Sequence, residues 1–200
     1  MIIVGIDPGS QRVGYAVVEV TAAMRKPVLR DLGVWPILKM AQTAAKDAGA
    51  PVIRPVLGER LECLHELAID FLAEWNPRWV GLEKVVHFKN AASAHTLAEA
   101  RGVLRLALHQ SLDQAEMRLV ELSPTAVKKV AAGFGVTTKQ GVLKAMELRF
   151  PELRELQKKR DFDFDAFDAL AIALTTWAGT KIRASSSLSR AFPKGNARRR

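Results

Sequence analysis

The sequence predicts a mixed α/β fold, in which helices pack on a five-stranded sheet. Two observations support this prediction. First, five short apolar or β-rich segments have the length and composition of strands: residues 2–6, 15–20, 28–36, 78–82 and 118–122. Second, from residue 59 onward the strands alternate with segments of helical periodicity, which is the order expected when helices cover a sheet.

The first two predicted strands form a hairpin. Residues 2–6 are a continuous apolar run, and Asp7-Pro8-Gly9 closes it with residues that favour a turn. The segment after Gly14 is rich in β-branched residues and is a suitable antiparallel partner. Asp7 therefore lies at the end of a buried strand.

Helices follow from periodicity and from their end signals. Residues 59–75 repeat apolar side chains at about 3.6 residues, and Asn76-Pro77 stops the run. Ser123-Pro124 has the composition of a helix start, and Gly133 predicts a break in that helix. The other predicted helices are residues 91–110, 138–150 and 165–178, whereas residues 40–57, with two prolines, predict an irregular insertion.

Length and charge predict one domain with a basic tail. Residues 1–180 are long enough to bury a sizeable core. The net charge is +9, but residues 181–200 hold seven Lys and Arg and no acid, so residues 1–180 carry only +2. We therefore expect a disordered tail over residues 181–200, and the charge alone is weak support for nucleic-acid binding.

No targeting or membrane segment is expected. The N-terminus lacks a basic region, its apolar run ends at Asp7, and no stretch reaches the roughly 18 apolar residues of a membrane span. A single cysteine, Cys63, excludes an internal disulfide and is typical of a reducing cytoplasm.

Four acids occupy special places in this scheme. Asp7 and Glu83 each end a predicted strand, and Asp165 and Asp168 share one face at the start of a helix. If the two strand ends adjoin and the helix crosses them, the carboxylates converge. Clustered carboxylates repel one another unless a cation lies between them, and oxygen ligands favour Mg²⁺ or Mn²⁺. Two such ions can support phosphodiester hydrolysis.

Each acid also has an ordinary structural interpretation. Asp7-Pro8-Gly9 is a common turn sequence. Asp165 and Asp168 suit a helix N-terminus because of the helix dipole. The metal-site hypothesis therefore depends on the whole set.

Five segments resemble the RuvC family of Holliday-junction resolvases, in order along most of the chain. They are GIDPGS (5–10) followed by Gly14-Tyr15, GLEKV (81–85) followed by Lys89-Asn90-Ala91, ARGV (100–103), the stretch from Val127-Lys128 to Lys139, and DAFDALAIA (165–173).

The resemblance implies an RNase H-like fold with helices on both faces of the sheet. It implies a bacterial, cytoplasmic, nucleoid-associated homodimer that cuts four-way DNA junctions symmetrically with Mg²⁺, in contact with a branch-migration motor. The catalytic residues it implies are Asp7, Glu83, Asp165, Asp168 and Lys139, the four acids holding two ions. DNA contacts are expected at Lys84, Phe88, Lys89, Arg101, Lys128 and Lys139.

Two departures from the family stand out. Many relatives have an aromatic residue three positions after the glutamate, where it can stack on an unpaired base, but here that position is Val86, and Phe88 is the nearest aromatic. The interval from Asp7 to Glu83 is also long, and residues 40–57 account for it.

Three other functions are compatible with parts of this pattern. An RNase H-like nuclease acting on RNA or an RNA–DNA hybrid would use similar acids. An actin-like ATPase opens with a similar strand and turn, but it needs a second domain and a second Gly-rich loop, which we do not find. A non-catalytic junction-binding protein would not need the full acid set.

Overall fold

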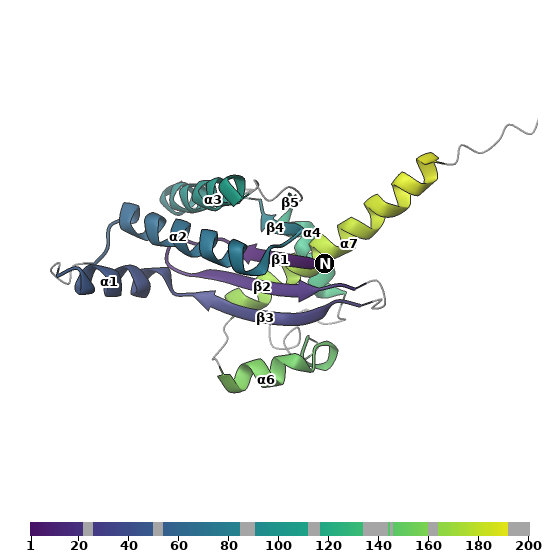
Figure 1. Ribbon diagram of the computed structural model, residues 1–200, viewed down its shortest axis with the longest axis horizontal. Helices are drawn as coiled ribbons and strands as arrows, with labels where there is room; N and C mark the ends of the chain where they lie inside the picture. Colours follow the sequence, from purple (N-terminus) through teal and green to yellow (C-terminus); the bar gives the residue numbers. More distant parts are fainter. Residues whose placement is uncertain are drawn as a thin grey trace, which may run out of the picture.

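Five strands form one mixed sheet in the order β3-β2-β1-β4-β5 (Figure 1). They are β1 (Ile2–Asp7), β2 (Val13–Glu19), β3 (Val28–Trp35), β4 (Trp79–Glu83) and β5 (Arg118–Leu122). The structure is a computed structural model, and it describes residues 1–21, 26–49, 54–84, 91–111, 117–133, 144, 146–159 and 164–191. All five predicted strands are present.

β1 is the central strand. It pairs antiparallel with β2, with Asp7 opposite Gly14, and this confirms the predicted hairpin. On its other side it pairs parallel with β4, which in turn pairs parallel with β5. β3 adds antiparallel to β2. The acids that end β1 and β4 therefore lie at the same edge of the sheet.

Helices cover both faces of this sheet, as predicted (Figure 1). They are α1 (Ile37–Asp47), α2 (Leu57–Trp75), α3 (Ala91–Ser111), α4 (Pro124–Ala132), α6 (Glu152–Lys159) and α7 (Phe164–Ala191). α1, α2 and α3 bury their apolar side chains in one core with one face, and α4 and α7 do so in a second core on the other face, where α6 also packs.

The two cores follow from the alternation of side chains along β1. Ile3 packs in the α7 core, whereas Val4 and Ile6 pack in the α2–α3 core, and all three are almost fully buried. Because successive strand residues point to opposite faces, the same parity places residues 5 and 7 on the α7 side. The parity of β1 thus assigns Asp7 to the face that α7 covers.

α7 lies against the backbone of the central strands. A Cβ atom built on Gly5 would lie 2.2 Å from the carbonyl oxygen of Ala169, and one on Gly14 would lie 2.0 Å from the carbonyl oxygen of Asp165. Real Cβ atoms do not approach backbone atoms this closely, so both positions require glycine. The first turns of α7 therefore rest directly on β1 and β2.

The predicted end signals are confirmed where the structure describes them. Asn76 has a left-handed backbone (φ 41°) at the end of α2, a conformation that asparagine tolerates better than most residues. The Ser123 hydroxyl accepts a 3.2 Å hydrogen bond from the Ala126 N–H and caps α4, with Pro124 in the first turn.

Three segments differ from the predictions. Residues 40–57 are not irregular throughout, because α1 continues to Asp47; no Gly or Pro interrupts residues 37–47, and Ile37 and Ala41 are buried. α6 has no predicted counterpart. α7 does not end at Ala178 but at Ala191, so residues 181–191 of the predicted disordered tail are helical. No proline occurs between residues 164 and 191, and Gly179 alone does not stop the helix.

Other predictions lie partly outside the described residues. In the predicted helix 138–150, Lys144 and residues 146–149 are helical, and the remainder before residue 150 is not described. The same holds for residues 192–200 of the predicted tail. Of the helices in the described residues, none has the length and apolarity needed to cross a membrane.

We predict that Gly5→Ala destabilises the fold strongly. The new methyl group would overlap the α7 backbone at Ala169 and Ala173, and overpacking of this kind costs about 3 kcal/mol or more when backbone must move. The matched control is Gly102→Ala in α3, where a Cβ meets nothing within 4 Å; it should stabilise by about 0.5–1 kcal/mol. Urea unfolding measures both, and equal stability of the two variants would contradict the close approach.

Candidate active site

Two of the predicted acids end neighbouring parallel strands. Ile6 of β1 pairs with Leu82 of β4, so Asp7 and Glu83 follow next in the same register. Neighbouring strands lie about 4.8 Å apart. Leu82, like Ile6, belongs to the α2–α3 core, so Glu83, like Asp7, is on the α7 side by alternation. Both acids are half-buried.

The first turn of α7 supplies the other two acids. The Asp165 backbone rests on Gly14, which pairs directly with Asp7, so the start of α7 stands beside the end of β1. Asp168 follows one turn later on the same helix face, and its carboxylate acts electrostatically on Glu83. The ends of β1 and β4 and the start of α7 thus lie at one edge of the sheet.

The charges around Glu83 are strongly coupled. Burial raises the pKa of the Glu83 carboxyl above its ordinary value of 4.5, and the neighbouring Asp168 carboxylate raises that pKa further. Lys128 of α4 and Arg101 of α3 act in the opposite direction and lower it. The net effect raises the pKa of Glu83, so the neighbouring cations offset only part of the cost of its negative charge.

Asp165 forms an ion pair with Arg12. The Arg12 Nε donates a 3.1 Å hydrogen bond to the Asp165 Oδ2, in an ion pair whose side chains are 52% and 40% exposed. Arg12 was not among the predicted site residues. No local sequence signal marks Arg12 as a partner of Asp165, which lies 153 residues further along the chain. An exposed pair of this kind contributes little stability.

The donor set suits a hard divalent cation. All four predicted ligands are carboxylates, and such oxygen ligands favour Mg²⁺ and Mn²⁺. Within the described residues, no three acidic, histidine or cysteine side chains are placed so that they could hold one metal ion together. Asp165 Oδ2 accepts a hydrogen bond from Arg12.

The predicted DNA contacts have different environments. Lys84 is exposed directly after β4, and its backbone N–H donates to the Leu122 carbonyl oxygen. Lys128 is exposed on α4, and its positive charge lowers the pKa of Glu83. Phe88, Lys89 and Lys139 lie outside the described residues, as does Val86.

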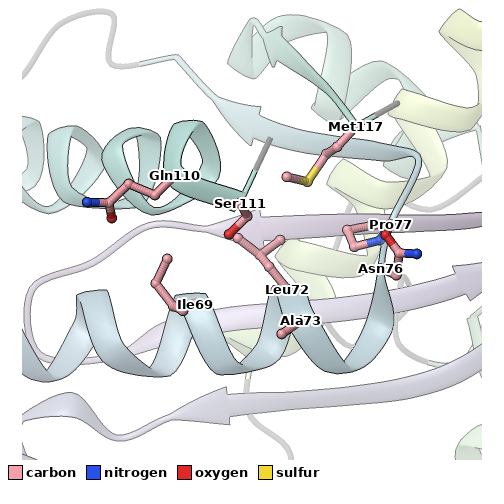
Figure 2. A pocket seen from close by; sticks show the side chains of 8 residues that line it. All are labelled: Ile69, Leu72, Ala73, Asn76, Pro77, Gln110, Ser111 and Met117. Atoms are coloured by element: carbon pink, nitrogen blue, oxygen red, sulfur yellow. The ribbon is translucent and has the colours of Figure 1, made fainter. Parts of the chain in front are cut away.

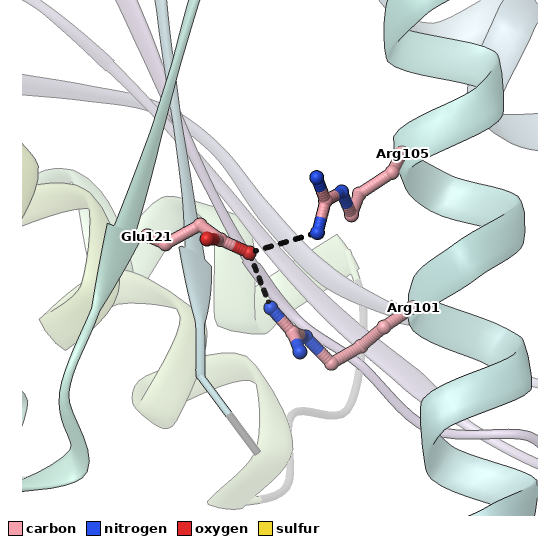
Figure 3. Close-up of polar contacts among 3 residues, drawn as sticks. All are labelled: Arg101, Arg105 and Glu121. Carbon is pink, nitrogen blue, oxygen red and sulfur yellow. Dashed lines mark hydrogen bonds and ion pairs between the residues drawn. The ribbon is translucent and has the colours of Figure 1, made fainter. Parts of the chain in front are cut away.

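Arg101 is the exception among these cations, because it is mostly buried. Its side chain is 13% exposed, and its Nη2 lies 2.7 Å from the Oε1 of Glu121 on β5 (Figure 3). Arg105, one turn further along α3, reaches the same oxygen at 3.4 Å but is 57% exposed. Glu121 was not among the predicted site residues, and an acid on an edge strand carries no sequence signal of such a role.

A separate cavity lies at the opposite end of the sheet. Its volume is about 190 Å³, and it lies between the ends of α2 and α3, with Met117 preceding β5 (Figure 2). Its lining includes the apolar Leu72 and the polar Asn76 and Gln110. Asn76 precedes β4, whereas Glu83 ends that strand, so the cavity is not part of the acid cluster.

We predict that Glu83→Gln raises the free energy of unfolding at neutral pH without divalent cations. Because the Glu83 pKa is raised on folding, the folded state binds the proton more tightly, and stability falls as the pH rises through the folded-state pKa. The amide cannot ionise. The variant and the parent should have the same free energy of unfolding below pH 4.5, the ordinary pKa of the carboxyl. Above that pH the free energy of unfolding of the variant should exceed that of the parent.

Urea unfolding in chelator, between roughly pH 4 and 8, measures this difference. Glu74→Gln, on the exposed side of α2, controls for the loss of one charge. A Glu83→Gln variant that is less stable than the parent at neutral pH would contradict the electrostatic description of the site.

The chain is similar to known proteins along most of its length. The family model described as "Crossover junction endodeoxyribonuclease RuvC" matches residues 3–176. The RuvC protein of Synechococcus sp. (strain WH7803) is 32% identical over 180 residues, which cover 88% of this chain and 98% of that relative. The RuvC protein of Petrotoga mobilis is 32% identical over 173 residues, or 86% and 91% of the two chains.

A solved structure supports the fold. The structure of "T. thermophilus RuvC in complex with Holliday junction substrate" matches with a TM-score of 0.65 and 22% identity, covering 91% of this chain and 96% of that chain. The mixed sheet with strand order β3-β2-β1-β4-β5 is RNase H-like. The family match spans all five ordered motifs, and the chain therefore belongs to the RuvC family of crossover junction endodeoxyribonucleases.

Proposed function

We propose that Asp7, Glu83, Asp165 and Asp168 form one metal-binding active site, at which the protein hydrolyses phosphodiester bonds of four-way DNA junctions. One observation carries this assignment: two acids end adjacent parallel strands on the face against which the first turn of α7 packs. Family membership supplies the class of reaction, and the RuvC family is generally metal-dependent.

The four carboxylates would hold Mg²⁺, with Mn²⁺ as a substitute, and we infer two ions from the number of ligands. When bound, such ions supply an activated water and stabilise the leaving oxygen of the phosphodiester. The protein contributes the ligands and their spacing. Glu83 and Asp168 interact electrostatically, so we assign them to one side of Asp7, and Asp165 to the other.

Cations around the acids would receive the DNA backbone. Lys128 is exposed and close enough to act on Glu83, so we assign it to the phosphate nearest the site. Lys84, Phe88, Lys89 and Lys139 remain proposals from the family resemblance, Lys139 as the cation that neutralises charge on the reacting phosphate. Such contacts give affinity and position more than sequence preference.

The substrate has approximate two-fold symmetry, and we propose a C2 homodimer that presents two active sites to strands of like polarity. The relative from T. thermophilus was solved with a Holliday junction. In α3, Ala100 and Ala107 are buried within the subunit, so the proposed contact between copies would use the exposed small residues near its start. We place this action in the bacterial cytoplasm, together with a branch-migration motor.

The primary test compares substrates. We expect cutting of a synthetic four-way DNA junction in Mg²⁺, loss of cutting when a chelator removes the metal, and recovery when Mg²⁺ returns. Linear duplex and an RNA–DNA hybrid are the control substrates. Preference for the hybrid would identify a nuclease acting on RNA, whereas junction binding without any cutting would identify a binding protein.

We predict that Asp7→Asn retains junction binding and loses cleavage. The amide removes one anionic ligand from the centre of the acid cluster, and changes even at outer-shell partners of metal ligands typically cost about 10–100-fold in activity or metal affinity. The cleavage rate should fall by more than about 100-fold.

Gel-shift and cleavage assays on the same junction measure the two properties. Asp70→Asn, which removes an exposed acid of α2, is the charge-matched control and should behave like the parent. If Asp7→Asn cut at the parent rate, the assignment of the acid cluster would be wrong.

A further inference from the structure

The loop of residues 8–12 follows Asp7 and connects β1 to β2. Asp7 pairs with Gly14 across this loop. A Cβ atom built on Gly9 would lie 2.2 Å from the carbonyl oxygen of Arg12, so the loop folds back tightly on itself. Because the loop is short and compact, a displacement of its backbone would move the end of the strand that carries Asp7.

Three consecutive residues of this loop contact three different helices. The carbonyl oxygen of Ser10 accepts a 3.1 Å hydrogen bond from the Nη1 of Arg60 on α2. The carbonyl oxygen of Gln11 accepts a 3.1 Å hydrogen bond from the N–H of Leu38 in the first turn of α1. Arg12 forms the ion pair with the first turn of α7. α1 and α2 lie on one face of the sheet and α7 on the other (Figure 1), so the loop is held from both faces.

Arg60 is a half-buried arginine that contacts main chain. Besides the Ser10 carbonyl oxygen, its Nη1 lies 3.5 Å from the Ser10 Oγ. Its Nε is buried and has no hydrogen-bond partner among the described residues. Withdrawing a charged group from water costs free energy, and here that cost accompanies a contact between residues 50 positions apart in the chain. The arginine therefore ties α2 to the loop directly, through a contact that no local sequence pattern predicts.

We propose that Arg60 is a positioning residue of the proposed active site, which acts through the backbone of Ser10 to hold the loop after Asp7. This inference rests on the proposed function, because the loop affects catalysis only if the neighbouring acids bind the metal ions. The planar guanidinium presents its donors in fixed directions, so it restrains both the distance and the orientation of the Ser10 carbonyl group. The end of β1 and the Arg12 side chain then keep their places beside α7.

Two other roles of Arg60 would have different consequences. A contact with a DNA phosphate would supply binding affinity, and its loss would weaken junction binding and reduce the salt slope by about one. A purely structural contact would supply stability, and its loss would lower the unfolding temperature without changing cleavage by the folded protein. Loss of a positioning residue instead lowers kcat and weakens the response to Mg²⁺, whereas junction binding without metal stays the same.

The experiment compares Arg60→Gln with the parent, both as the whole chain, on a synthetic four-way DNA junction below the unfolding temperature of the variant. We expect kcat to fall by about 10–100-fold, as for other changes around metal ligands. The Mg²⁺ concentration for half-maximal cleavage should rise. The dissociation constant of the junction without metal should stay within about twofold of the parent value, with an unchanged salt dependence.

Two further variants sharpen the comparison. Arg60→Lys keeps the charge and can donate to the same carbonyl oxygen, but it lacks the planar arrangement of donors, so it should recover only part of the lost kcat. Arg54→Gln removes an exposed arginine shortly before α2, and its kcat should stay within about twofold of the parent value, as expected for a surface substitution. If Arg60→Gln does not fold, Arg60→Lys is compared with Arg54→Lys, and equal kcat values would overturn the proposal.

The proposal also predicts a change that does not depend on activity. In Arg60→Gln the backbone amides of residues 9–12 should exchange hydrogen faster than in the parent, because the loop has lost one of its contacts. Unchanged exchange in the loop would overturn the proposal, as would a parent-level kcat with weaker junction binding or with a lower unfolding temperature alone. A parent protein that does not cut junctions at all would instead contradict the proposed function, and the exchange measurement would still test the contact.

Discussion

The close approach of α7 to β1 and β2 is the constraint on which the rest of the candidate active site depends. The carbonyl oxygen of Asp165 and the backbone of Ala169 and Ala173 occupy the space in which side chains of Gly14 and Gly5 would lie. A helix this close to a sheet cannot slide or rotate without overlap, because packed interiors have few voids. The orientation of the first turn of α7, and with it the direction of two acids, follows from this contact.

That contact places like charges at the edge of an apolar core, and the protein compensates for them from several directions. Two unit charges about 4 Å apart interact by about 4 kcal/mol at an effective dielectric constant near 20, so an uncompensated acid cluster would oppose folding. Arg12 pairs with Asp165, and Lys128 and Arg101 act on Glu83. The raised pKa of Glu83 indicates that this compensation is partial, which is the condition in which a divalent cation binds favourably.

Much of the fold could be predicted from local patterns. The strands, the hairpin at Asp7, the stop at Asn76 and the cap at Ser123 depend on residues that are close in the chain, and all were predicted. The irregular insertion and the end of α7 were predicted wrongly. Both predictions relied on amino-acid composition, whereas these segments are helical because they contain no residue that ends a helix. Residues 37–47 contain no Gly or Pro, and Gly179 costs a long helix too little to end it.

The sequence by itself determined, through the order of its motifs, which family the chain belongs to, and it predicted four carboxylates as metal ligands. It did so because strand ends and helix starts leave local signatures, and because carboxylates are the ligands that hard cations require. Only the tertiary structure decided the partners of those residues. Arg12 lies beside Asp165, and Arg101 forms an ion pair with Glu121, 20 residues further along the chain. Contacts of this kind depend on how helices pack on the sheet, and a surface-type arginine or glutamate carries no local sign of its partner.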